Sequence, residues 1–219
     1  VSRIADAVAL PLIVDADTGF GNAVNTWRTM KVLERAGAAA IQLEDQNFPK
    51  RCGHFNGKGV IPLHEMLPKI EAAAAARTKD TLIIARTDAL AVDGIDAALD
   101  RAAAFVEAGA DLTFVEAPRD AAQMRRIAGL NVPQIANIVH GGKTPPLPQA
   151  ELAEMGFGLV LYANAALQAA VRASVEVLGS LKATGSLDAV HDRLASFEER
   201  QQAVVKDRWD ALEQRFKSE

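Results

Sequence analysis

The feature that most constrains the fold is a repeat of short apolar segments, each followed by a loop and, in most cases, by an amphipathic helix. Six such segments lie in the first three quarters of the chain, at 10–17, 38–45, 81–88, 111–117, 132–139 and 158–163. Buried apolar strands that alternate with helices are typical of a parallel sheet. The sequence therefore predicts an α/β protein built from βα units.

Polar and charged residues come at the carboxyl ends of these predicted strands: Asp15, Asp17, Glu44, Arg86, Glu116 and Asn137. A doubly wound open sheet gathers its site at one topological switch point, whereas a (β/α)8 barrel spreads it over the carboxyl ends of many strands. We therefore predict a (β/α)8 TIM-type barrel. Six strands are visible where eight are needed, and the chain starts at Val1 without methionine, so we expect two βα units to lie upstream.

Two regions differ in character. Residues 1–184 are predicted to form the partial barrel with the active site, and residues 185–219 a charged, helical extension that packs on a neighbouring subunit. The chain is 49% hydrophobic and 24% charged, with a formal net charge of −4. This balance argues against a nucleic-acid binder or an anionic-membrane binder. One cysteine cannot form an internal disulfide, so we expect a cytoplasmic protein.

Asp15 and Asp17 are two residues apart, so on a strand both side chains would point to the same face. Two carboxylates that converge repel each other unless a cation or a proton lies between them, and hard oxygen ligands suit Mg²⁺. The alternative is that these residues form a turn or cap a helix. Of the adjacent acids Glu44 and Asp45, only one can face the interior, and periodicity does not show which.

The loop after residue 46 contains the only cysteine, within Lys50-Arg51-Cys52-Gly53-His54. Neighbouring cations lower the pKa of a thiol and so favour a reactive cysteine, although most free cysteines are simply small buried hydrophobes. Arg86 at a strand end is suited to holding a substrate carboxylate, unless it only pairs with Asp88 at the rim. Glu116 and Asn137 are weaker candidates, since each alone is more often a satisfied polar group.

Together these segments make the chain similar to the isocitrate lyase and phosphoenolpyruvate mutase superfamily. The similarity runs from about residue 12 to 184, and its markers are the segments at 14–21, 43–46, 50–54, 85–88 and 136–137. The lysine–arginine–cysteine–glycine–histidine segment resembles that of the lyase branch. The size resembles 2-methylisocitrate or dimethylmalate lyases, and the segment 141–145 is closer to the dimethylmalate type or to uncharacterised members.

The resemblance implies roles for individual residues. It implies that Asp15 binds Mg²⁺ or Mn²⁺, with Asp17 and Glu44 acting directly or through water. It implies that Cys52 is a general acid on a gating loop, within a catalytic group that also contains Lys50, Arg51 and His54. The expected substrate contacts are Gly53, Arg86, Glu116 and Asn137. It also implies a homotetramer in which the last barrel helix is exchanged between subunits.

The resulting hypothesis is a Mg²⁺-dependent carbon–carbon lyase. It would cleave a 2-hydroxy di- or tricarboxylate to a 2-oxo acid, pyruvate or glyoxylate, and a second carboxylate. One alternative is an oxaloacetate or phosphonate enzyme of the same superfamily. Another is a non-catalytic assembly subunit that acts through the C-terminal helices.

Overall fold

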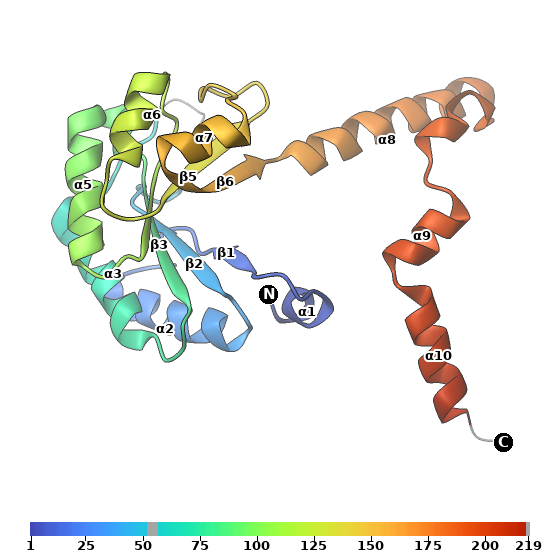
Figure 1. Cartoon of the computed structure of the whole chain (residues 1–219), viewed down its shortest axis with the longest axis horizontal. Coiled ribbons are helices and arrows are strands. Elements are labelled where there is room, and N and C mark those ends of the chain that lie inside the picture. The colour runs from blue at the N-terminus through green and yellow to red at the C-terminus, as the bar shows by residue number, and fades with distance from the viewer. Residues whose placement is uncertain (52–56, 218–219) are drawn as a thin grey trace. The chain divides into compact units, whose positions relative to one another are not determined.

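The computed structural model of the protein describes residues 1–51 and 57–217 (Figure 1). Its internal contacts divide the chain into two compact units, Val1–Ala163 and Asn164–Glu219. The first unit is a sheet of six parallel strands in sequential order, curled into a half-barrel. The strands are β1 (Ile13–Asp15), β2 (Ala40–Glu44), β3 (Leu82–Thr87), β4 (Leu112–Val115), β5 (Gln134–Val139) and β6 (Phe157–Ala163). The prediction of an α/β fold with a parallel sheet is confirmed, whereas closure by eight strands stays a prediction.

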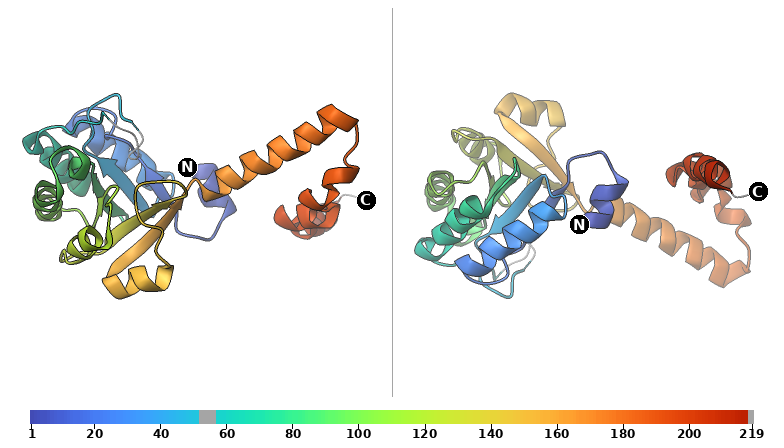
Figure 2. Two further views of the ribbon diagram at one scale, coloured as in Figure 1. Left: turned by 90° about the horizontal axis from the view of Figure 1, so that it is seen from above. Right: turned by 90° about the horizontal axis from the view of Figure 1, so that it is seen from below.

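Seven helices of the first unit lie within the described residues. They are α1 (Ser2–Ala7), α2 (Ala23–Arg35), α3 (Leu63–Ala76), α4 (Ala89–Val92), α5 (Ile95–Glu107), α6 (Ala121–Ala128) and α7 (Gln149–Met155). Helices α2, α3, α5 and α6 line the outer side of the curled sheet (Figures 1 and 2). The sequence did not predict α4 or α7. Both are short, and α7 follows a proline-rich segment that is typical of a loop.

The two faces of the sheet have separate cores. Ile83 and Ala85 of β3 pack in a cluster with residues of α2 and α3. Ile84, between them, belongs to a different cluster whose buried members all come from strands: Ala40, Leu112, Phe114 and Ile135. Successive strand residues alternate between faces, so Ile84 marks the inner face of the half-barrel, opposite the helices. This alternation decides which polar side chains face the interior.

The second unit is helical. It contains α8 (Ala165–Thr184), the 3₁₀ helix η1 (Asp188–Arg193), α9 (Phe197–Ala203) and α10 (Lys206–Phe216). The compact units divide before α8, and the predicted domain boundary at 184 stays a prediction. No helix in the described part of the chain is both long and apolar enough to span a membrane.

Candidate active site

Of the two adjacent acids at the end of β2, Glu44 faces the interior. It is in phase with Ala40 of the inner cluster, and its partner in the sheet register is Arg86 of β3. Asp45 is in phase with Ile41 and Leu43, which pack on the helix side. The alternation of the two cores therefore settles a question that the sequence left open.

Asp45 holds the rim of the sheet together. Its carboxylate accepts hydrogen bonds from the Thr87 hydroxyl at 2.7 Å, the Asp88 backbone N–H at 3.0 Å and Arg101 Nε at 2.9 Å. Arg101 also donates to the Ile61 carbonyl at 2.7 Å, which ties α5 to the segment after the cysteine loop. Burial raises the pKa of Asp45 in spite of these donors. Asp45 thus serves the structure of the rim.

Asp15 and Asp17 meet, but not as alternate residues of one strand. Strand β1 ends at Asp15, and Asp17 lies in a turn with a φ of 49°. The Asp17 N–H donates to Asp15 Oδ1 at 2.9 Å, so these residues form a turn, and both carboxylates still contact one cation, the Lys50 ammonium. The expectation that both project from one strand face is wrong, because the strand is shorter than the apolar segment suggested.

The Lys50 ammonium lies among three carboxylates. Lys50 Nζ is 3.3 Å from Asp15 Oδ2 and 3.7 Å from Glu44 Oε2, and it forms an ion pair with Asp17. Burial opposes the charge of Lys50, yet its hydrogen bond to Asp17 and the charges of Glu44 and Asp15 raise its pKa. Within residues 1–51 and 57–217, no set of three or more acidic, histidine or cysteine side chains is already arranged as a metal site. In this structure a lysine is the cation that the three acids share.

Glu44 is a buried acid that accepts no hydrogen bond from residues 1–51 or 57–217. Neither of its carboxylate oxygens has a hydrogen-bond partner among the described residues, and its side chain is 0% exposed. Burial raises its pKa from the ordinary value of 4.5 to about 7, while the charges of Arg86 and Lys50 act in the opposite direction. A buried carboxylate whose oxygens accept no hydrogen bond from the described residues can bind either a proton or a cation.

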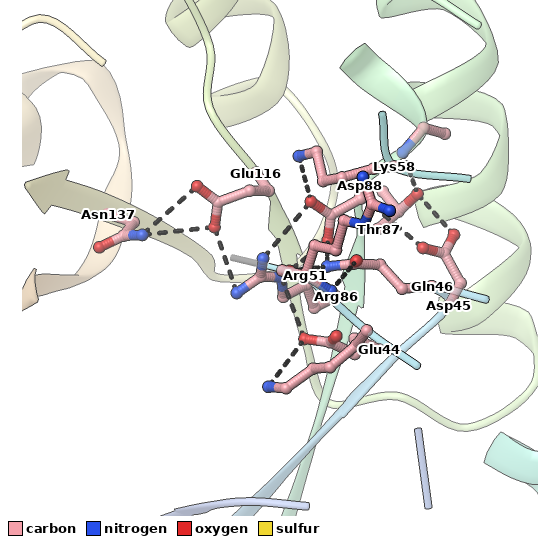
Figure 3. Close-up of polar contacts among 12 residues, drawn as sticks. Glu44, Asp45, Gln46, Arg51, Lys58, Arg86, Thr87, Asp88, Glu116 and Asn137 are labelled. Carbon is pink, nitrogen blue, oxygen red and sulfur yellow. Dashed lines mark hydrogen bonds and ion pairs between the residues drawn. The ribbon is translucent and has the colours of Figure 1, made fainter. Parts of the chain in front are cut away.

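Arg86 lies at the centre of a second group of acids (Figure 3). Its guanidinium is 3.0 Å from Asp88, 3.3 Å from Glu116 and 3.5 Å from Glu44, and it lies over the ring of Phe114. Burial opposes its charge, but the three acids raise the pKa of Arg86 above the usual arginine value. The Arg86–Asp88 pair expected as an alternative is present, and Arg86 also connects acids from three strands or strand ends.

Glu116 and Asn137 extend this group towards β5. Asn137 Nδ2 donates to both carboxylate oxygens of Glu116, at 3.3 and 3.4 Å. Asn137 is 6% exposed, and its Oδ1 has no hydrogen-bond partner in the described part of the chain. The amide therefore presents an unused acceptor next to the acids.

Sequence reasoning missed two residues that connect the cysteine loop to the site. Gln46 accepts from the Arg51 N–H and donates to the Arg51 carbonyl, both at 2.9 Å, and it donates to Asp88 at 3.2 Å. Lys58 Nζ is 2.5 Å from Asp88 Oδ1, with both side chains buried. The phase of β2, which places Gln46 two residues after Glu44, could have indicated Gln46. No pattern in the sequence marked Lys58.

The predicted catalytic segment is only partly described. The side chain of Lys50 reaches the acids of β1 and β2, and the backbone of Arg51 is held by Gln46. Cys52, Gly53 and His54 lie outside the described residues. The structure thus brings together Asp15, Asp17, Glu44, Lys50, Arg86, Glu116 and Asn137 at the carboxyl edge of the sheet.

Comparison with known proteins gives a consistent family. The family model for phosphoenolpyruvate phosphomutase matches residues 1–182. The chain is 45% identical over 201 residues to 2,3-dimethylmalate lyase of Eubacterium barkeri, a match that covers 90% of this chain and 69% of that protein. It is also 45% identical over 194 residues to 2-methylisocitrate lyase of Aeropyrum pernix, covering 88% and 63%. The chain thus spans about two thirds of the length of these relatives.

Solved structures agree in fold. A crystal structure of 2,3-dimethylmalate lyase matches with a TM-score of 0.91 and 32% identity, covering 98% of this chain and 72% of that one. Phosphonopyruvate hydrolase in complex with oxalate and Mg²⁺ matches with a TM-score of 0.85 and 35% identity, covering 98% and 76%. Since the family model covers well over half of the residues, the chain belongs to the isocitrate lyase/phosphoenolpyruvate mutase superfamily.

Proposed function

We propose that the protein is a Mg²⁺-dependent carbon–carbon lyase for a 2-hydroxy di- or tricarboxylate of the dimethylmalate or 2-methylisocitrate type. The products would be a 2-oxo acid, pyruvate or glyoxylate, and a second carboxylate. The observation that carries the proposal is the convergence of Asp15, Asp17 and Glu44 on one cation beside Arg86. Two relatives that are 45% identical to the chain are lyases, which is compatible with the lyase branch.

The residues present fit a divalent metal. All three acids offer hard oxygen donors, and both Glu44 oxygens are buried and accept no hydrogen bond in the described part of the chain. A positive charge already lies among them in the form of the Lys50 ammonium. Asp15, Asp17 and Glu44 would hold Mg²⁺ directly or through water, and the Mn²⁺ ion suits the same donors. When bound, the metal would supply Lewis-acid stabilisation of the oxygens of the 2-oxo acid.

The side chains around the metal position would bind and orient the substrate. Arg86 supplies positive charge where a carboxylate and the developing enolate-like oxyanion need it. Asn137 presents an acceptor, which suits the substrate hydroxyl, whereas binding a carboxylate would require its amide NH₂ to leave Glu116. Lys50, released from the acids by the metal, would become free to contact the substrate.

The bond cleavage needs one proton removed and one delivered. Loss of the hydroxyl proton allows the adjacent carbon–carbon bond to break, which leaves a 2-oxo acid and an enolate-like carboxylate. We propose that Cys52 protonates the carbon of that enolate, a role that rests on its sequence context between Arg51 and His54. Because it is the only cysteine, substitution there removes every thiol from the protein.

We also propose that α8 associates with other subunits, as expected for an exchanged helix in a homotetramer. The helix buries none of its residues, and apolar side chains recur along it at helical spacing: Leu167, Val171, Val175, Leu178 and Leu181. A stripe of this kind on a soluble helix favours a protein partner. Sedimentation of Leu178→Glu should show smaller species than the wild type, and an unchanged assembly would contradict this role.

The activity test is release of 2-oxo acid from dimethylmalate, methylisocitrate, isocitrate and oxaloacetate in the presence of Mg²⁺. We expect cleavage of one 2-hydroxy acid, and a loss of several orders of magnitude in turnover for Cys52→Ser with unchanged folding. Near-wild-type turnover in this variant would refute the general acid. Turnover of oxaloacetate alone, independent of Cys52, would instead support the oxaloacetate branch of the superfamily.

A further inference from the structure

A cavity of about 500 Å³ lies beside the carboxylate cluster, between the loop after β1 and the segments that flank the cysteine loop. Residues from three segments line it, among them Asp17, Phe20, Phe48, Lys50, Ile61 and Lys69. Asp17 and Lys50 also belong to the group that would hold the metal. A ligand bound at the carboxylate cluster can therefore extend into this cavity, and a two- or three-carbon acid would leave most of it empty.

Lys69 on α3 gives the cavity a positive charge that forms no ion pair among the residues the structure describes. Its ammonium donates to the Thr18 carbonyl at 3.0 Å, and among the described residues no carboxylate lies within 4 Å of it. Burial lowers the pKa of Lys69, with a weaker opposing effect from the charge of Glu65. A partly desolvated ammonium with one neutral partner would gain a strong interaction from an organic anion.

The other residues that line the cavity are apolar enough to contact alkyl groups of a ligand. Phe20 and Phe48 are 60% and 86% exposed, and Ile61 completes the apolar lining. Large exposed aromatic side chains around a concave site are characteristic of ligand binding. Lys50 is already paired with Asp15, Asp17 and Glu44, so Lys69 is the lining cation that would attract an anion, and the apolar walls suit a ligand that is also aliphatic.

From this geometry we propose that the cavity binds the distal end of the substrate. Lys69 would hold a terminal carboxylate, and Phe20, Phe48 and Ile61 would contact the alkyl substituents. The inference rests on the proposed lyase function and deepens it, because it assigns the selection of an alkyl-substituted dicarboxylate to residues outside the carboxylate cluster. Lys69 would then determine substrate specificity without contacting the reacting atoms.

The test compares two probes by isothermal titration calorimetry in the presence of Mg²⁺. Oxalate is too short to leave the metal position, whereas methylsuccinate carries a second carboxylate and a methyl group. We expect Lys69→Met to weaken methylsuccinate binding about tenfold or more and to leave oxalate binding within about twofold. Lys79→Met, which removes an exposed lysine after the same helix, is the matched control and should change neither.

A second pair of variants separates ligand binding from support of the Thr18 loop. Phe48→Ala alters only an exposed wall and should also weaken methylsuccinate selectively. Lys69→Gln keeps a donor for the Thr18 carbonyl but no charge, and it should behave like Lys69→Met. The proposal is overturned if wild type does not bind methylsuccinate, if Lys69→Met weakens both probes equally, or if it weakens neither. If methylsuccinate binding depends on Lys69 while no hydroxy acid is cleaved, the cavity site stands and the lyase assignment fails.

Discussion

The pKa of Glu44 makes a quantitative prediction about stability. A carboxyl whose pKa is 4.5 in the unfolded chain and about 7 in the folded chain binds more protons when folded, over the pH range between these values. The free energy of unfolding therefore falls as the pH rises from 4.5 to 7, and the full difference corresponds to about 3 kcal/mol. Glu44→Gln is close in shape to the protonated acid, so it should be more stable than wild type by up to this amount at pH 8 and nearly equal near pH 4.5.

Urea unfolding at pH 5 and pH 8 without divalent metal measures this difference. Glu71→Gln is a suitable control because Glu71 is an exposed glutamate of α3. Added Mg²⁺ should then stabilise wild type, since a ligand that binds only the folded state raises its stability, and should stabilise Glu44→Gln much less.

The pH dependence decides whether this reasoning holds. If Glu44→Gln is less stable than wild type at pH 8, the attraction of the Glu44 carboxylate to Arg86 and Lys50 exceeds the free-energy cost of burying it. If the stability difference between wild type and variant is the same at both pH values, Glu44 does not titrate near 7. Either result would refute the inference that burial raises the pKa of metal-free Glu44 to about 7.

Three further predictions concern the neighbouring charges. Lys50→Met removes the cation shared by the three acids, and calorimetry should show Mg²⁺ binding about tenfold tighter; weaker binding would mean that Lys50 assembles the site. Arg101→Met leaves Asp45 buried without its cation, so urea unfolding should show a loss of about 3 kcal/mol at pH 7, and a loss below about 1 would contradict its role at the rim. Burial raises the pKa of Glu34, but hydrogen bonds from Thr78 outweigh this effect and lower the pKa overall. The stabilisation from Glu34 is therefore present above pH 4.5 and lost as the pH falls through the folded pKa. Glu34→Gln should cost about 1–2 kcal/mol of stability at pH 7 and less at pH 3, measured by urea unfolding.

The sequence predicted all six strands because each is a buried apolar run followed by a break, a signal that depends only on neighbouring residues. It also predicted that polar residues would gather at the strand ends, since parallel strands share one carboxyl edge. It did not predict α7, because seven residues after several prolines carry too little helical periodicity. The length of β1 was overestimated because the apolar run begins at Leu10, before the first paired residue, Ile13.

The sequence was less informative about which polar side chains contact one another. That Glu44 faces inwards follows from the cores on the two sides of the sheet, and these depend on contacts between distant segments. Lys58 reaches Asp88 across 30 positions, and nothing near Lys58 in the sequence indicates a buried lysine. Partners of this kind are fixed by register and loop path, which local patterns do not encode.

The ion pairs at the carboxyl edge form one connected group with an unbalanced charge. Within the described residues, Lys50 links Asp15, Asp17 and Glu44, Glu44 links to Arg86, and Arg86 leads on to the remaining members Asp88, Glu116 and Lys58. Five acids face three cations, so the group carries two excess negative charges when all are ionised. Without metal, part of this excess can be relieved by protonating Glu44, consistent with its pKa of about 7. One divalent cation would offset most of this excess even if it displaced Lys50, so the charge count and the Glu44 oxygens, which accept no hydrogen bond from the described residues, support the same metal position.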